Sequence, residues 1–435
     1  MLNARPVEGR FRTLRANVNA ILVLILFAVP WIRIGGEPLV LLDIAARRFH
    51  VGGLVIFPQE LYLLWLLVIG LAISLFFFTA LAGRLWCGWA CPQTVFTDVF
   101  AGIARRVEGW KGHARPKRVA PWRRVLLHAI WLACSAAIGF HLVGYFHSPY
   151  TMLGEIRAGE LSATTIGFFT FATLVSYADF VYVRQTFCKF LCPYARFQSV
   201  MFDRDTLVIG YDARRGDPRG KRAEGDCVDC GLCVQVCPSG IDIRDGLQLD
   251  CIACTQCIDA CDGVMAKLGR EPSLIGYRAL ATLEGLRPAR VLRARVVVYG
   301  AILAVIGLAF GSLLARREAL SVEIIRNRAE LVHMTADGRA SNAYTLHIQN
   351  RSREPRRFRV ALDADGAPGF ELVTGMNPVA VAASDEVETR VFVLAPRDAD
   401  VGIEGREIRF EVSAEDDASA QVVRPARFLG KGATG

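Results

Sequence analysis

Eight cysteines lie close together between Cys227 and Cys261, in two runs with nearly the same spacing. The first run reads C-x2-C-x2-C-x3-C-P, and the second repeats it with an aspartate in place of the proline. In such a run three thiolates on one tight turn bind three corners of an iron–sulfur cube, and a distant thiolate binds the fourth. Zinc ribbons use paired C-x2-C units instead, and a disulfide framework needs an oxidising compartment. The spacing therefore predicts a domain built around two [4Fe–4S] clusters.

The ligands of each cluster are expected to come from both runs, because the fourth cysteine of each run binds the other cluster in bacterial two-cluster ferredoxins. For the first cluster the expected ligands are Cys227, Cys230, Cys233 and Cys261. For the second cluster they are Cys237, Cys251, Cys254 and Cys257. Small residues such as Gly231 and Ala253 would let each turn pass close to its cluster.

Five apolar segments reach or approach the length of about 20 residues that a helix needs to cross a bilayer. We expect them at residues 18–34, 61–85, 125–146, 166–183 and 296–315. Apolar residues make up 53% of the chain, which is high for a soluble protein. The first and fourth segments are short and contain Pro30 and Asp179, so a re-entrant or interfacial segment is the alternative for these two.

The distribution of lysine and arginine predicts how the chain crosses the membrane. The loop at residues 105–124 has eight Lys or Arg and one acid, and arginines also precede the first segment. Because positive loops stay inside, the N-terminus, this loop and the ferredoxin part are expected in the cytoplasm of a bacterial inner-membrane protein. The chain after residue 315 is then periplasmic. The basic loop would face anionic membrane lipid, and no recognition motif beside it indicates a nucleic-acid partner.

The last part of the chain changes to short alternating runs separated by turn residues, such as YTLHIQN and REIRFEVSAE. This pattern predicts a β-sandwich, immunoglobulin-like but without the Cys…Trp…Cys hallmark. The expected fold is a multidomain membrane protein with an α-helical bundle of five membrane helices, a ferredoxin domain and this sandwich. Its parts are a cytoplasmic N-terminus (1–17), a four-helix membrane domain (18–203), the ferredoxin domain (204–292), a fifth membrane helix (293–316) and the periplasmic sandwich (317–435).

Two matching motifs follow the second and fourth membrane segments at their cytoplasmic ends. WCGWACP contains Cys87 and Cys91, and FCKFLCP contains Cys188 and Cys192. Positions i and i+4 share one helix face about 6 Å apart along the axis, and the proline would disturb or restart the helix beyond the second thiol. If the two helical hairpins pack side by side, four thiolates could converge and suit Cu(I), an iron–sulfur centre or a reversible dithiol. The alternative is that they are packing cysteines.

Together these motifs resemble the FixG/RdxA/CcoG family of cytochrome c oxidase accessory proteins. The resemblance extends to CPYARFQSVMFDRDTLVIGYDARRGDPRG and GGEPLVLLDIAARRFHVGGLVIFPQE, whereas SYADFVYVRQTF departs from the family's usual wording. It implies five membrane helices, two [4Fe–4S] clusters and a C-terminal immunoglobulin-like domain outside the membrane. It also implies reduction of Cu(II) to Cu(I) for assembly of cbb3-type oxidases. The four membrane cysteines map onto the family's copper or relay motifs, which would make them the catalytic residues.

The expected reaction is electron transfer from a separate cytoplasmic donor of unknown identity, because the chain shows no dinucleotide or flavin motif. Copper would be the substrate or a bound ion, and the partners would be oxidase assembly factors or copper chaperones. Two other hypotheses remain: a quinol-oxidising subunit of a periplasmic reductase system, and a non-catalytic scaffold that senses redox state. Asp179 is a further candidate with Tyr177 and Tyr182 as partners, since intramembrane acids are costly. The resemblance gives His141 and His147 no role.

Overall fold

The computed structural model divides the chain into two compact units, Met1–Gly311 and Ser312–Gly435. It describes residues 4–110, 116, 118–327, 332–363, 366–397, 401, 405–417 and 420–430. Part of the basic loop, residues 111–115 and 117, lies outside the described residues. The second unit begins five residues before the expected start of the C-terminal domain at residue 317.

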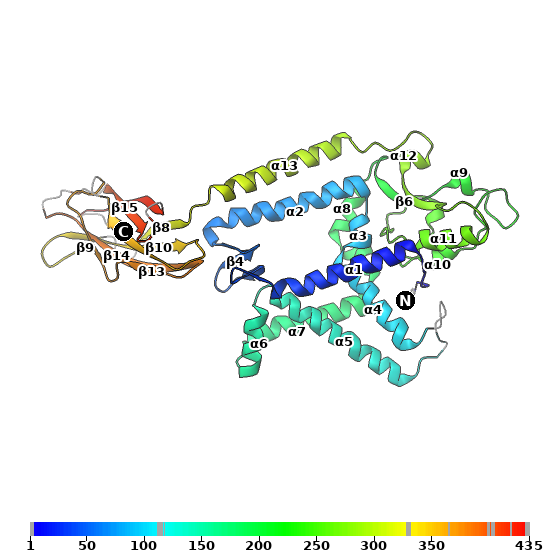
Figure 1. Ribbon diagram of the computed structural model, residues 1–435, viewed down its shortest axis with the longest axis horizontal. Helices are drawn as coiled ribbons and strands as arrows, with labels where there is room; N and C mark the ends of the chain where they lie inside the picture. Colours follow the sequence, from blue (N-terminus) through cyan, green and yellow to red (C-terminus); the bar gives the residue numbers. More distant parts are fainter. Residues whose placement is uncertain are drawn as a thin grey trace. The chain divides into compact units, whose positions relative to one another are not determined.

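Five helices are long and apolar enough to cross a membrane (Figure 1), which confirms the number expected from the sequence within the described part of the chain. They are α1 (Arg10–Ala28), α2 (Leu61–Ala82), α5 (Pro121–Gly144), α7 (Ala163–Ala178) and α13 (Ala294–Ala315). A short 3-10 turn extends α1 and a π-helical turn extends α7, so the first and fourth candidate spans reach 22 and 21 residues. Both are long enough for a bilayer, so the re-entrant alternative gains no support.

Helix α1 starts earlier than expected, at Arg10 instead of residue 18. The length of the apolar segment predicted a helix start after the arginines. In the structure, the main-chain N–H groups of Phe11 and Arg12 donate hydrogen bonds to the carboxylate of Asp259, at 3.1 and 2.7 Å. Asp259 lies on α11 (Gln256–Lys267), which packs against the N-terminal end of α1 (Figure 1). A distant acid therefore caps the helix and satisfies amides that would otherwise lack partners, so the polar segment is helical.

Short elements connect the membrane helices. Between α1 and α2 lie a 3-10 turn (Val29–Trp31), β1 (Arg33–Ile34), β2 (Glu37–Pro38), β3 (Val40–Asp43), β4 (Arg48–Val51), β5 (Leu54–Ile56) and a second 3-10 turn (Pro58–Glu60). Strands β3, β4 and β5 form one antiparallel sheet, and β1 pairs with β2. Later connections contain α3 (Leu85–Trp89), α4 (Pro92–Glu108), α6 (Pro149–Ala158), π-helical turns at Asp179–Val183 and Phe187–Leu191, and α8 (Pro193–Met201). Helix α5 packs against both α4 and α7 (Figure 1).

The cysteine-rich part is closed by a two-stranded antiparallel sheet of β6 (Leu207–Tyr211) and β7 (Ile275–Ala279). The remaining elements are α9 (Ala213–Gly216), α10 (Leu232–Gln235), a 3-10 turn (Ile243–Asp245), α11 and α12 (Leu280–Leu283). The sheet joins the two ends of the segment, and its core brings Ile209 and Ile275 against several of the cysteines. This closure lets the two cysteine runs contribute to the same sites.

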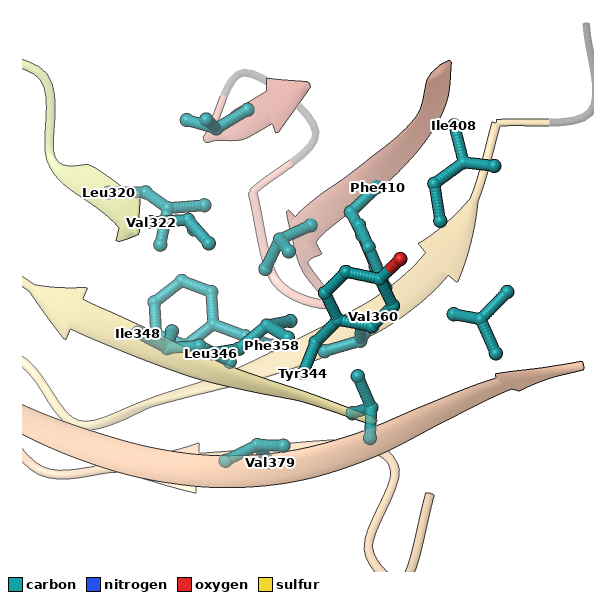
Figure 2. Packing of buried hydrophobic residues seen from close by; sticks show 14 of the residues in the cluster. Leu320, Val322, Tyr344, Leu346, Ile348, Phe358, Val360, Val379, Ile408 and Phe410 are labelled. Atoms are coloured by element: carbon teal, nitrogen blue, oxygen red, sulfur yellow. The ribbon is translucent and has the colours of Figure 1, made fainter. Parts of the chain in front are cut away.

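The second unit is a sandwich of two antiparallel sheets, as predicted. One sheet has the order β12-β14-β10-β8, with β9 on the edge of β10, and the other has the order β13-β11-β15-β16. The strands are β8 (Leu320–Arg326), β9 (His333–Met334), β10 (Ala340–Asn350), β11 (Arg356–Leu362), β12 (Glu371–Thr374), β13 (Val379–Val381), β14 (Asp385–Leu394), β15 (Arg406–Ala414) and β16 (Gln421–Phe428). Figure 2 shows alternate residues of β10, such as Tyr344 and Leu346, facing Phe358 and Val360 of β11. This alternation is the pattern that the sequence displays.

Candidate functional site

The cysteine-rich part contains two cavities, and the first is lined by Cys227, Cys230, Cys233 and Cys261. These are the four side chains expected to hold one cluster, three from the first run and one from the second. The rest of the wall is mainly apolar and includes Tyr211, Val264, Met265, Leu274 and Ile275. The fold therefore brings a cysteine on α11 into the turn that carries the first run.

The second cavity is lined by Cys237, Cys251, Cys254 and Cys257, the other expected set. Its wall also contains Cys233 and an apolar lining of Ile209, Ile241, Ile243 and Ile252. Since Cys233 lines both cavities, the two sites are neighbours. The fourth cysteine of each run therefore lines the cavity of the other run, as the spacing predicts.

Burial favours the protonated form of five of the eight thiols when they bind no iron. It raises the pKa of Cys233 and Cys254 to about 11 and the pKa of Cys251 and Cys261 to about 12. Burial also raises the pKa of Cys257 well above its usual value, and the neighbouring thiols raise it further. A thiolate in these positions therefore needs a compensating positive charge.

Main-chain N–H groups supply part of that compensation. The amides of Val234, Ala253 and Gln256 donate hydrogen bonds to the sulfur atoms of Cys233, Cys251 and Cys254, respectively. Each bond favours the thiolate and lowers the pKa against the effect of burial. Hydrogen bonds to cysteine sulfur are also a means by which proteins tune iron–sulfur centres.

Thiols in two groups of four, mainly apolar walls and amides directed at sulfur fit two [4Fe–4S] clusters. The first would be held by Cys227, Cys230, Cys233 and Cys261, and the second by Cys237, Cys251, Cys254 and Cys257. Iron binding would release the protons that burial keeps on the thiols. When bound, such clusters supply one-electron transfer.

The two membrane motifs differ from the expected geometry, because the two cysteines of each pair do not share one continuous helix face. Cys87 lies in the short helix α3, whereas Cys91 has an extended backbone and directly precedes α4. In the same way Cys188 lies in a π-helical turn, whereas Cys192 is extended and precedes α8. The prolines that follow Cys91 and Cys192 begin new helices, as expected. The preceding helical turn of each motif therefore ends before the second thiol.

The structure still brings these four thiols within electrostatic range of one another. Burial raises the pKa of Cys87 and Cys188 to about 12, and negative charge at Cys91 or Cys192 would raise it further. The thiol of Cys87 also donates a hydrogen bond of 3.2 Å to the buried side-chain oxygen of Gln198. Within the described residues, no three His, Cys, Asp or Glu side chains are close enough to bind a single metal ion. The four thiols, here called the membrane thiol group, are therefore a loose group and not a preformed single-ion site.

The first membrane motif packs directly against the loop that carries the second set of cluster cysteines. A Cβ atom on Gly88 would clash with the main chain of Ile252 and Ala253, so glycine allows the two backbones to touch. Next to it, the indole N–H of Trp89 donates a hydrogen bond of 2.9 Å to the hydroxyl of Tyr277 on β7. The membrane thiol group and the second cavity thus adjoin each other.

A buried arginine fixes this junction, and nothing in the sequence pattern singled it out. Arg15 of α1 is only 1% exposed, and its Nε donates a hydrogen bond of 2.6 Å to the main-chain oxygen of Gly88. Its guanidinium also lies 2.9 Å from the carboxylate of Asp98 on α4, which Arg12 approaches at the same distance. Arg15 falls outside the expected apolar span. The sequence signal for its buried position was that it lies next to this span.

The other polar candidates have ordinary structural partners. Asp179 accepts a hydrogen bond of 3.1 Å from Gln93, so the expectation that Tyr177 or Tyr182 pairs with it was wrong. The reason is that α4 packs against the π-helical turn and supplies the amide. The hydroxyl of Tyr177 contacts His128 at 2.7 Å instead.

The two histidines near the C-terminal end of α5 are also engaged within the membrane part. His141 accepts a hydrogen bond of 3.2 Å from the indole N–H of Trp31, and its other ring nitrogen lies 2.8 Å from the main-chain oxygen of Ala137. His147 lies 3.2 Å from the carboxylate of Glu155. Neither histidine joins the membrane thiol group.

Comparison with known protein families agrees with this organisation. A model described as a 4Fe-4S dicluster domain matches residues 183–280, and one described as a 4Fe-4S binding domain matches residues 63–111. The second match includes Cys87 and Cys91, so the iron–sulfur alternative for these thiols stays open. A third model, the IG-like fold at the C-terminal of FixG, matches residues 310–431.

Curated relatives cover almost the whole chain. Protein RdxA of Cereibacter sphaeroides is 39% identical over 91% of this chain and 89% of its own length. Nitrogen fixation protein FixG of Rhizobium meliloti is 34% identical over 99% of this chain and 93% of its own length. The shorter ferredoxin-type protein NapH of Haemophilus influenzae is 26% identical over 45% of this chain and 66% of its own length. The chain belongs to the FixG/RdxA/CcoG family of membrane-bound iron–sulfur electron-transfer proteins.

Proposed function

We propose that this protein reduces Cu(II) to Cu(I) at the membrane thiol group and supplies the Cu(I) for assembly of a cbb3-type cytochrome c oxidase. The observation that carries the proposal is the contact of Gly88 with the main chain of Ile252 and Ala253. This contact puts the thiol of Cys87 beside the part of the protein that would store electrons. Copper is the fitting acceptor because thiolates are soft ligands that favour Cu(I).

The proposed reaction is a one-electron step. A Cu(II) ion gains one electron from the reduced protein and becomes Cu(I), and thiolates of the membrane thiol group hold the product. Because burial raises the pKa of Cys87 and Cys188 to about 12, a thiol that binds copper releases its proton. The loose spacing of the group suits a substrate ion that enters and leaves, since no described group of residues is built as a permanent single-ion site.

We also propose the bacterial inner membrane as the location, with the N-terminus and the cysteine-rich part in the cytoplasm and the sandwich in the periplasm. The support is the excess of lysine and arginine at residues 105–124 and before α1. A cytoplasmic donor would then reduce the protein, and oxidase assembly factors or copper chaperones would receive the Cu(I). Reporter fusions at the two ends of the chain would test this orientation.

The direct test uses purified protein, reduced without oxygen and mixed with Cu(II) and a Cu(I)-specific chelator. We expect Cu(I) to form in step with the return of the oxidised iron–sulfur absorbance. In the double variant Cys87→Ala/Cys188→Ala the rate should fall at least tenfold while the cluster content stays unchanged. The matched control is Cys134→Ala, which removes a half-buried thiol of α5 outside the group.

Three results would contradict the proposal. Equal Cu(I) formation by wild type and the double variant would show that copper is reduced elsewhere. Failure of both to reduce copper, together with reoxidation of the wild type by a quinone analogue, would favour the quinol reaction instead. If an oxidase assembles fully in the presence of a variant that lacks both clusters, the scaffold hypothesis would replace both the copper and the quinol reactions.

A further inference from the structure

A buried arginine lies at the start of the first membrane motif. Arg84 is only 7% exposed and directly precedes α3, the short helix that carries Cys87. Gly83 before it has a φ angle of 56°, and a Cβ atom there would clash with the main-chain oxygen of Leu207 on β6. The end of α2 therefore packs closely against the cysteine-rich part, and Arg84 is buried at this contact.

The guanidinium of Arg84 is only partly satisfied by hydrogen bonds. Its Nη2 donates a hydrogen bond of 2.9 Å to the main-chain oxygen of Ala195 on α8. Its Nε is buried and forms no hydrogen bond with any residue that the structure describes. An arginine keeps its positive charge in proteins, and burial of that charge is costly unless a negative group compensates it.

The carboxylates of the segment that follows α8 are paired with other arginines. Asp203 lies 2.8 Å from Arg293, and Asp205 lies 2.6 Å from Arg287. Among the described residues, no carboxylate lies within 4.0 Å of the Arg84 guanidinium. An ion pair with a carboxylate therefore does not explain why this cation is buried.

The positive charge of Arg84 acts on two thiols that belong to different sites. Burial raises the pKa of Cys87 and Cys251 to about 12, and the charge of Arg84 acts on both in the opposite direction. Cys87 belongs to the membrane thiol group, and Cys251 belongs to the second set of cluster cysteines. The guanidinium is thus within electrostatic range of both sites, at the junction where Gly88 contacts the cysteine loop.

The side chain of Cys87 has a fixed place relative to this charge. Gln198 on α8 is fully buried, accepts the thiol hydrogen bond of Cys87 and donates a hydrogen bond of 3.4 Å to the hydroxyl of Thr79 on α2. That hydroxyl also lies 2.6 Å from the hydroxyl of Tyr194. Because these contacts join α2, α3 and α8, they hold the sulfur in the same packed unit as Arg84.

Copper binding would create a negative charge in this place. A Cu(I) ion carries one positive charge and each thiolate carries one negative charge, so a complex with two thiolates is an anion. Thiolates are the soft ligands that Cu(I) prefers. Burial of such an anion is costly in apolar surroundings, and a neighbouring fixed cation offsets this cost.

We propose that the guanidinium of Arg84 stabilises the anionic complex that Cu(I) forms with Cys87 and a second thiolate of the membrane thiol group. Arg84 acts through Cys87 and is a positioning residue, because it need not touch the ion. The inference rests on the proposed copper reduction and names the group that retains its product. The same positive charge favours the more negative, reduced state of the second cluster, so one cation serves both sites.

Competition for Cu(I) with a chromophoric chelator tests the inference on the cluster-containing protein without oxygen and without a reduction step. Arg84→Gln keeps an N–H donor for Ala195 but removes the charge, so it should weaken Cu(I) binding about tenfold, the usual effect of losing an interaction with a charged group. Arg84→Lys keeps a positive charge and should bind within about threefold of wild type. The matched control is Arg204→Gln, which removes the same charge from a side chain that is 70% exposed.

The reduction potential of the second cluster gives a readout that does not involve copper. Arg84→Gln should lower this potential, because loss of a nearby positive charge disfavours the reduced state, and Arg84→Lys should leave it near the wild-type value. A redox titration followed by electron paramagnetic resonance measures it. Cluster absorbance shows whether each variant is folded, and Arg84→Met replaces Arg84→Gln if the latter lacks its full cluster content.

The outcomes separate this inference from the proposed function. Wild-type Cu(I) affinity in Arg84→Gln, together with weak binding in Cys87→Ala, would overturn the inference and leave the copper site in place. Equal losses in Arg84→Gln and Arg84→Lys would assign Arg84 to its hydrogen bond with Ala195 and would also overturn it. An unchanged potential in Arg84→Gln would overturn the role at the second cluster. If Cys87→Ala binds Cu(I) as tightly as wild type, the proposed function loses its site and the inference fails with it.

Discussion

The C-terminal sandwich and the cysteine-rich part differ in what fills their interiors. In the sandwich, apolar side chains from both sheets, such as Ile348, Phe358 and Phe410, are fully buried against one another (Figure 2). In the cysteine-rich part, thiols line two cavities beside the apolar side chains of Ile209 and Ile275. The sandwich interior is complete without a cofactor, whereas the other interior leaves room for an inorganic one.

The backbones of the cysteine turns also differ from regular strands. Asp229, Ala253 and Thr255 have φ angles of 52°, 55° and 65°, in the left-handed region that favours glycine. Each costs on the order of 1–2 kcal/mol relative to a right-handed conformation. Thiolate–iron bonds can offset such strain, but a loop without its cofactor cannot. One domain is therefore stabilised by its own side chains and the other by what it binds.

Removal of the clusters should give the largest difference between the two parts. Chelation of iron under oxidising conditions is expected to abolish amide protection across residues 207–279 and leave that of residues 320–428 unchanged. The reason is that the two cavities lose their contents while the sandwich core stays filled. Hydrogen exchange read by mass spectrometry checks this, and equal protection of both parts after chelation would contradict the comparison.

A substitution in the sandwich core should destabilise the sandwich and leave the cysteine-rich part unchanged. Phe410→Ala is expected to destabilise the sandwich by about 3–5 kcal/mol, because it removes a fully buried ring from the core. Denaturant unfolding followed by exchange of the sandwich amides measures the loss, and the cluster absorbance should not change. The matched control is Phe392→Ala, since that ring is 45% exposed and its removal should cost much less. Similar costs for the two substitutions would argue against the packing in Figure 2.

Gly88→Ala should separate the membrane motif from the second cluster-binding loop. The added Cβ would clash with the main chain of Ala253, and relief of such overpacking typically costs about 1–3 kcal/mol. We expect an altered electron paramagnetic resonance signal of the second cluster and slower copper reduction. Gly154→Ala is the control, because a Cβ on that helical glycine of α6 meets no atom within 4 Å. An unchanged signal in Gly88→Ala would show that the two segments are not in contact.

Asp259→Asn should have the smallest effect, at the start of α1. Loss of the charge weakens the cap on Phe11 and Arg12 and should cost about 1 kcal/mol. Faster exchange of the amides of these two residues measures this effect. Asp262→Asn on the same helix is the control, because its carboxylate accepts a hydrogen bond from Ser273 instead. Equal exchange in both variants would mean that another group caps α1.

Much of the architecture could be predicted because it depends on local patterns. The cysteine spacing indicated two clusters, the apolar lengths indicated five membrane helices, and the alternation after residue 320 indicated a sandwich. The internal geometry of the membrane motifs could not be predicted in the same way. A helical spacing of four residues implied one face for Cys87 and Cys91, but α3 ends at Trp89 and Pro92 restarts the chain as α4.

The sequence by itself determined which residues carry the chemistry, because thiol spacing, apolar length and strand alternation act over a few neighbouring residues. Only the tertiary structure decided how these parts meet. The contact of Gly88 with Ala253, the cap of α1 by Asp259 and the ion pair of Arg15 with Asp98 each join segments that are far apart in the chain. Such contacts depend on the packing of whole elements, and local periodicity does not specify which elements become neighbours.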